Sequence, residues 1–189
     1  YGSIHLIDKL NLTRFKQNPK WLVGFSDITV LHSFFLSQGY ASLHAPMARH
    51  LTIEPKDDLA VALMQKALFG DPINYIFKAH KYNHPGLSKG VLKGGNLSIL
   101  ESLSNTPLGV DATNTILYVE DVNESPNTVQ RMFYHLKLSG ALEKLSGLII
   151  GQFTDSFSNS NISKEVYKAI HPILKTYTYP ICYNFPIGH

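Results

Sequence analysis

A serine, a pair of carboxylates and a histidine each follow an expected β-strand in this chain. Ser26 comes after the apolar segment 21–25, Glu120 and Asp121 come after the segment 115–119, and His189 comes after the segment 180–185. In parallel α/β sheets, ligands gather at the carboxyl ends of the strands. A hydroxyl nucleophile, a histidine that takes its proton and a carboxylate that orients the histidine together perform acyl transfer. These strand ends are therefore the first candidates for a reactive site.

Each residue also has a purely structural interpretation. In the segment WLVGFSDITVLH, residues 21–32, Ser26 and Asp27 are good residues for the start of the helix expected over 27–38. Gly24 leaves room for a sharp turn, but the segment departs from the hydrolase pattern G-x-S-x-G. Glu120 and Asp121 are equally compatible with a solvated acidic loop, and the pattern does not choose between them. His189 by itself indicates nothing.

Strands and helices alternate along the chain. Apolar spacing predicts buried strands over 21–25 and 147–151, a further strand over 74–78, and helices over 27–38, 57–69, 127–140 and 163–176. Strands separated by helices of ten or more residues indicate an α/β fold with a largely parallel sheet. The polar segment 78–90 marks a boundary. We expect a domain over 1–80 that carries Ser26, a linker over 81–95 and a second domain over 96–189.

Composition narrows the function classes. The 189 residues carry a net charge of only +3 without a cluster of basic residues, so a nucleic-acid partner is not expected. No apolar run is long enough to span a membrane. The single cysteine, Cys182, fits a reducing compartment and a core position. His80 and His84 are four residues apart but lie beside Pro85 and Gly86 rather than in a helix, so we expect no zinc or other metal.

Five segments, in order, resemble one family. They are NPKWLVGFSDITVLH (18–32), LHAPM (43–47), LKGGNLSIL (92–100), ILYVEDVNESPNTVQRMFYHLKLSG (116–140) and FPIGH (185–189). Together they resemble the LD-carboxypeptidases, serine peptidases that trim murein tetrapeptides, and their microcin-immunity relatives. The resemblance extends over nearly the whole chain.

The resemblance implies a role for each candidate residue. It assigns Ser26 as the nucleophile, Glu120 as the acid and His189 as the base, and it places the Asp27 backbone amide in the oxyanion hole. It places His44 at the same rim, as a structural or substrate-contacting residue, and it implies no organic cofactor or metal. Asn96 is expected to cap a helix and is also a candidate for substrate contact. The family often has an arginine near its glycine-rich segment, where this chain has Ile4 and His5.

The resemblance also implies an architecture. A flavodoxin-like N-terminal domain, truncated at its start, would carry the serine, and a C-terminal swivelling β/α domain would carry the glutamate and the histidine. We expect a cytoplasmic homodimer that acts on murein peptides, in a chain that is a fragment at both ends. Two alternatives stay open: an immunity-type peptidase that cleaves a peptide–nucleotide antibiotic, and a non-catalytic α/β ligand-binding module in which Ser26 only caps a helix.

Overall fold

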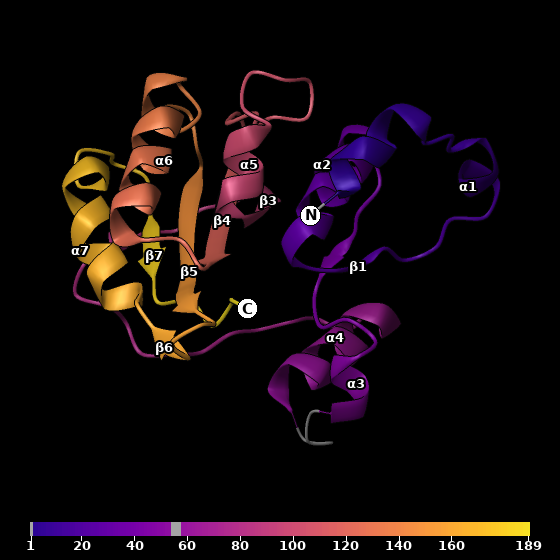
Figure 1. Ribbon diagram of the computed structural model, residues 1–189, viewed down its shortest axis with the longest axis horizontal. Helices are drawn as coiled ribbons and strands as arrows, with labels where there is room; N and C mark the ends of the chain where they lie inside the picture. The colour runs from indigo at the N-terminus through magenta and orange to yellow at the C-terminus, as the bar shows by residue number, and fades with distance from the viewer. Residues whose placement is uncertain (1, 54–57) are drawn as a thin grey trace. The chain divides into compact units, whose positions relative to one another are not determined.

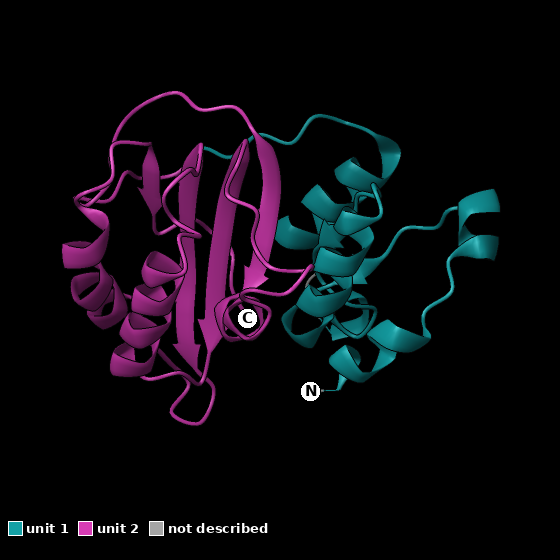
Figure 2. Cartoon of the chain, turned by 90° about the horizontal axis from the view of Figure 1, so that it is seen from above, with its two compact units in different colours: residues 1–76 teal, residues 77–189 magenta. Residues whose placement is uncertain are grey.

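The computed structural model describes residues 2–53 and 58–189. The chain divides into two compact units, residues 1–76 and 77–189 (Figure 2). The predicted domain ends at residue 80 and the predicted linker covers 81–95, so the division observed here lies a few residues earlier. Each unit is described by itself below.

The first unit holds a small parallel sheet and a series of helices. Its elements are η1 (Ser3–Lys9), α1 (Thr13–Gln17), β1 (Val23–Gly24), η2 (Ser26–Ile28), α2 (Thr29–Ser37), β2 (Leu43–His44), α3 (His50–Ile53) and α4 (Leu59–Phe69). Strands β1 and β2 pair in parallel, so that Gly24 lies opposite His44. The helix predicted over 27–38 is present, with a first turn of 3-10 type. It buries Val30 and Phe35.

Two other predictions for this unit had different outcomes. The helix predicted over 57–69 is α4: the Asp58 carboxylate accepts a hydrogen bond from the amide of Val61, and Gly70 ends the helix with a φ of 81°. Residue 57 lies outside the described residues. The strand predicted over 74–78 was wrong, because this segment has no strand partner and leaves Ile76 fully exposed. Alternation of apolar side chains alone does not make a strand without a neighbour to bond.

The second unit is an α/β layer, as the alternation of elements predicted. Its elements are β3 (Val91–Asn96), α5 (Leu97–Ser102), β4 (Thr115–Val122), α6 (Pro126–Leu138), β5 (Gly147–Asp155), β6 (Ser160–Asn161), α7 (Ser163–Leu174) and β7 (Ile181–Tyr183). Strands β3, β4, β5 and β7 lie in this order and are parallel, and the short β6 pairs antiparallel with the end of β5 (Figure 1). The carboxyl ends of β4 and β5 therefore lie at one edge.

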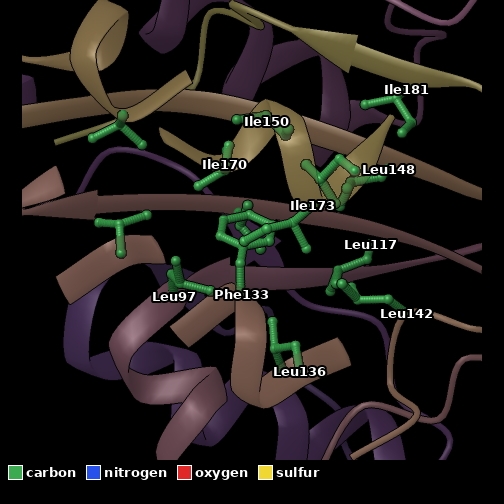
Figure 3. Close-up of a cluster of buried hydrophobic side chains, with 14 of the residues drawn as sticks. Leu97, Leu117, Phe133, Leu136, Leu142, Leu148, Ile150, Ile170, Ile173 and Ile181 are labelled. Atoms are coloured by element: carbon green, nitrogen blue, oxygen red, sulfur yellow. The ribbon is translucent and has the colours of Figure 1, made fainter. Parts of the chain in front are cut away.

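One hydrophobic core joins the helices to the sheet. Leu117 of β4 and Leu148 and Ile150 of β5 meet Phe133 of α6 there (Figure 3). Val119 of β4 belongs to the same core. Helices α5 and α7 contribute to the same core through Leu97, Leu100, Val166, Ile170, Ile173 and Leu174. All these side chains are almost fully buried. Each contributes roughly 1.5–3 kcal/mol by leaving water, so this core is what holds β4 and β5 in place.

The segment before β3 belongs to this second unit. The Tyr82 ring stacks on His171 of α7, with ring centroids 4.0 Å apart and an angle of 11° between the planes. His84 and Ile181 exchange two backbone hydrogen bonds, N–O 2.9 and 3.1 Å. Part of the predicted linker is thus fixed on α7 and β7, and its last residues form β3.

Phe133→Ala should lower the free energy of unfolding of the second unit by about 3–5 kcal/mol, because it leaves a cavity in the centre of the core. The matched control is Tyr134→Ala on the same helix, where the side chain is 48% exposed. Urea unfolding monitored by circular dichroism measures both. Equal losses in the two variants would show that this core does not carry the stability of the unit.

Candidate active site

Glu120 and His189 form a close contact in the second unit. The Nδ1 atom of His189 lies 2.6 Å from Oε2 of Glu120. The glutamate side chain is completely buried, whereas the histidine side chain is 16% exposed. A buried, ionised carboxylate favours the tautomer in which Nδ1–H donates to it, and this tautomer leaves Nε2 as the nitrogen that can accept a proton. Two residues 69 positions apart in the sequence thus have the arrangement of a base and its orienting acid.

The pleat of β4 separates the two adjacent carboxylates. Leu117 and Val119 point into the helix-covered core, so Asp121 shares their face and Glu120 lies on the opposite one. Strand β3 closes against β4 at this level, since Asn96 is in register with Glu120. Gly94 makes this approach possible: its φ is 154°, and a Cβ there would collide with the carbonyl oxygen of Tyr118. The strand pair thereby fixes the backbone from which Glu120 projects.

An irregularity in β5 brings the histidine to the glutamate. The β4–β5 register shifts between Val119 and Asp121, so that β5 has one residue more than β4. At this point the Gln152 amide donates to the carbonyl of Ile187 (2.7 Å), and the Phe185 amide donates to the carbonyl of Ile150 (3.1 Å). The segment 185–188 therefore runs along β5 and ends with His189 beside Glu120.

Gly151 is the residue that allows this close approach. A Cβ at Gly151 would lie 2.5 Å from both the carbonyl oxygen and a methyl carbon of Ile187. The Gly151 carbonyl accepts a hydrogen bond from the buried Tyr167 hydroxyl of α7 at 2.7 Å. This hydrogen bond links α7, which packs in the hydrophobic core, to β5, the strand along which the His189 segment runs.

Asp121 has a separate set of partners. Its carboxylate accepts hydrogen bonds from the Asn96 side-chain amide (2.7 Å) and from the backbone amides of Ser98 and Val122 (2.8 Å each). Burial raises the pKa of Asp121 and the charge of Glu120 adds to the rise, while these three donors oppose it. Asp121 therefore joins the ends of β3 and β4 to the start of α5. Asn96 also accepts from the Ile99 amide (3.3 Å), as the sequence predicted for a helix cap.

Ser26 occupies a strained corner in the first unit. It follows β1 after one residue, Phe25, opens η2 and has a φ of 64°, in the left-handed region that residues other than glycine seldom adopt. Such a conformation costs on the order of 1–3 kcal/mol and is typical of functional positions. Neither η2 nor α2 begins with a side-chain cap hydrogen bond, so the simple capping interpretation of Ser26 is not what the structure shows. A serine on a sharp strand-to-helix turn is instead the arrangement of a nucleophile elbow.

The other candidate residues of this unit lie around the corner or on η1. The carboxylate of Asp27 accepts a hydrogen bond from the Ser3 amide at 2.9 Å. His44 ends β2 opposite Gly24, with its ring 6.2 Å from that of Phe25. His5 lies exposed in η1. Ser26, Asp27 and His44 are thus brought together within one unit, and Glu120, His189 and Asn96 within the other.

Sequence reasoning missed two residues that build these sites. The sequence predicts Gly151 only as the end of a buried strand, although a glycine at a strand end is a usual signal for a bulge or a close backbone approach. His32 is predicted only as part of a helix. It is buried at 6% exposure, and its ring nitrogens lie 2.8 Å from the Ser42 hydroxyl and 2.9 Å from the Gly24 carbonyl oxygen.

Comparison with known families places these residues in context. Residues 1–45 match the model of the LD-carboxypeptidase N-terminal domain, and residues 89–189 match that of the LD-carboxypeptidase C-terminal domain. The chain belongs to the LD-carboxypeptidase family. The resemblance inferred from the five sequence segments is confirmed.

Individual proteins are similar to all or part of the chain. The murein tetrapeptide carboxypeptidase of Pseudomonas aeruginosa is 30% identical over 202 residues, covering 100% of this chain and 64% of the relative. The microcin C7 self-immunity protein MccF of Escherichia coli is 28% identical over 105 residues, covering 55% of this chain and 30% of MccF. The chain spans between 61% and 64% of the length of the first three curated relatives.

A solved structure shows the same fold. The crystal structure of muramoyltetrapeptide carboxypeptidase from Oxalobacter formigenes superposes with a TM-score of 0.82 at 26% identity, covering 99% of this chain and 65% of that one. The expected α/β class is confirmed by this likeness and by the sheets described above.

Across residues 2–53 and 58–189, His, Cys, Asp and Glu side chains form no group of three or more that could bind a metal ion. In the same part of the chain, no helix has the length and apolar character needed to cross a bilayer.

Gly151→Ala should displace the His189 segment and weaken the contact with Glu120, because the new methyl group occupies the space of Ile187. Gly147→Ala on the same strand is the control, since a Cβ there meets its neighbours at ordinary distances of 3.4–3.5 Å. The downfield proton NMR resonance of the His189 Nδ1–H reports the contact directly. We expect it to be lost or shifted in Gly151→Ala and retained in Gly147→Ala. An unchanged resonance in Gly151→Ala would contradict the role given to this glycine.

Proposed function

We propose that this chain provides the reactive residues of a serine carboxypeptidase that releases the terminal D-alanine of murein tetrapeptide. The observation that carries the proposal is the buried Glu120–His189 contact in one unit, together with the left-handed Ser26 at a strand-to-helix corner in the other. In a member of the LD-carboxypeptidase family, these three residue types supply a nucleophile, a base and an orienting acid. We assign these roles to Ser26, His189 and Glu120.

The proposed reaction is acyl transfer in two steps. The Oγ of Ser26 attacks the carbonyl carbon of the bond to D-alanine, and Nε2 of His189 takes the hydroxyl proton. The Asp27 amide donates to the oxyanion that forms. The C–N bond then breaks, and His189 gives its proton to the amine of the departing D-alanine. Water, deprotonated by His189, hydrolyses the ester on Ser26 and restores the enzyme.

Glu120 stabilises the positive charge that His189 carries between these proton transfers. Because the carboxylate is completely buried, its attraction for the imidazolium is weakened little by solvent. His44 and Asn96 are proposed neighbours of the substrate. His44 ends the strand beside β1, and Asn96 lies in register with Glu120.

The choice of a murein peptide is supported by the names of relatives from Pseudomonas aeruginosa and Oxalobacter formigenes. The similarity to MccF supports an immunity-type peptidase as the competing outcome. A homodimer and a cytoplasmic location stay predictions from the family resemblance. Size-exclusion chromatography with light scattering tests the first of them.

Ser26→Ala should reduce D-alanine release from an L,D-linked murein tetrapeptide by at least about 10³-fold, because the nucleophile is removed. The intact protein is assayed, and released D-alanine is measured with a D-amino-acid oxidase coupled reaction. Ser37→Ala is the matched control, as Ser37 is an exposed serine on the neighbouring α2. Full activity in Ser26→Ala would remove Ser26 from the reaction.

Substrate comparison separates the competing functions. The proposal predicts turnover of the L,D-linked tetrapeptide and none of the D,D-linked pentapeptide. Turnover of a peptide–nucleotide conjugate in place of the tetrapeptide would support the immunity-type peptidase. Binding of the tetrapeptide without release of D-alanine would support the non-catalytic module.

Glu120→Gln should reduce kcat by about 10⁴-fold, because the amide no longer stabilises the imidazolium or selects its tautomer. Glu101→Gln is the control: Glu101 also lies 2.6 Å from a histidine, His135, but both side chains are partly exposed. Steady-state kinetics on the tetrapeptide measure both variants. Comparable losses in the two would argue against a specific role for Glu120.

A further inference from the structure

We propose that His32 is a positioning residue for Ser26: its neutral, buried imidazole joins the end of β1 to the segment before β2 and so keeps the Ser26 corner in its reactive conformation. The proposal rests on the function proposed for Ser26. His32 itself touches no reacting atom. It acts on the reaction only through the backbone of the corner.

The geometry around His32 gives both ring nitrogens a partner. Nε2 lies 2.9 Å from the carbonyl oxygen of Gly24, which can only accept, so Nε2 carries the proton. Nδ1 lies 2.8 Å from the Ser42 hydroxyl, which therefore donates to it. One neutral tautomer of the ring satisfies both bonds at once. The ring is thus a link between α2, β1 and the start of β2.

The link lies where the corner needs support. Gly24 is the last residue of β1 and lies two positions before Ser26. It pairs across the sheet with His44, which follows Ser42 by two positions. The strained φ of Ser26 persists only if the surrounding structure holds it, and no side-chain cap does so at the start of η2 or α2. The bond from His32 to the Gly24 carbonyl is a buried side-chain contact that restrains this part of the backbone.

Protonation of His32 would change this arrangement. A second proton on Nδ1 turns it into a donor, so that the Ser42 hydroxyl has to accept instead of donate, and it places a positive charge in a buried site. Helix α2 packs against η1, η2 and β2, and Phe15 of α1 contacts Phe35 of α2. The titratable residues of these four elements are His5, Asp8, Lys9, Arg14, Lys16, Asp27 and His44. Of these, the His44 ring lies 6.1 Å from the His32 ring.

The direction of the pH effect follows from burial. Burial lowers the pKa of His32 below its ordinary value of 6.5, and the hydrogen bond to Gly24 only partly opposes this. As the pH falls, His32 takes up a proton in the unfolded chain at a higher pH than in the folded chain. The stability that the neutral His32 contributes to the folded state is therefore present above pH 6.5 and is lost as the pH falls below it.

The experiment compares three variants of the intact protein. His32→Gln keeps a donor for the Gly24 carbonyl and an acceptor for Ser42 but cannot be protonated. His32→Leu keeps most of the volume and loses both bonds. Ser37→Ala on the same helix is the control. We expect His32→Leu to lower kcat on the tetrapeptide on the order of 10²-fold, with His32→Gln losing less than about tenfold and KM changing little in either.

The pH profile separates positioning from general stability. In the wild type both His189 and His32 must be neutral, so log(kcat/KM) should fall on the acid side with a slope approaching two. In His32→Gln the slope should be one, with the same substrate and hence the same substrate ionisations. A slope of two in His32→Gln, or equal kcat in His32→Leu and wild type, would overturn the proposal.

A second readout does not depend on activity. The wild type should lose more thermal stability than His32→Gln between pH 7.5 and pH 5, because only the wild type takes up a proton at residue 32 on unfolding. If Ser26→Ala remained active, the proposed function would fail while this stability difference persisted. If the stability difference were absent and Ser26→Ala inactive, the role of His32 alone would be refuted.

Discussion

The buried carboxylate of Glu120 is the constraint around which the second unit is arranged. An ionised carboxylate taken fully out of water costs several kcal/mol unless charged or hydrogen-bonding groups compensate it. Here Oε2 is bonded to His189, while Oε1 is buried and has no hydrogen-bond partner among the described residues. The contact with His189 therefore has to be short and well fixed. Several local features of the sheet hold the two residues in this contact.

Three of these features belong to the backbone rather than to side chains. Gly94 allows β3 to approach β4 closely, the irregular register of β5 lets the Gln152 amide donate to Ile187, and Gly151 leaves room for the segment that carries His189. The hydrophobic core under α6 and α7 holds the strands in which these features occur. In the first unit the same principle applies in another form, since a strained serine corner is held by a buried histidine rather than by a helix cap. In both units, packing determines where the polar groups can act.

Much of the site could be predicted from the order of elements. Glu120 and His189 each follow a strand of one parallel sheet, and parallel strands bring such residues to one edge of that sheet, whereas Ser26 follows a strand of a separate two-stranded sheet. The choice between Glu120 and Asp121 could not be made from that order, because both carboxylates follow the same strand. In the structure the pleat separates the two carboxylates: Asp121 shares the face of Leu117 and Val119, and its oxygens accept hydrogen bonds from Asn96 and two backbone amides. The family resemblance had already pointed to Glu120, and that assignment stays a prediction.

Other elements could not be predicted because they depend on contacts far away in the sequence. The segment 74–78 alternates like a strand but has no neighbour to pair with. The role of Gly151 depends on a segment more than thirty residues later, and that of His32 on a strand end and a hydroxyl ten residues later.

In the proposed reaction, Ser26 forms an ester with the peptide. Mass spectrometry of the intact protein after rapid acid quench of a tetrapeptide reaction tests it most directly. The account predicts an added mass of the peptide less D-alanine on the fragment that contains Ser26, whereas D-alanine release with no adduct, or an adduct at another residue, would contradict it.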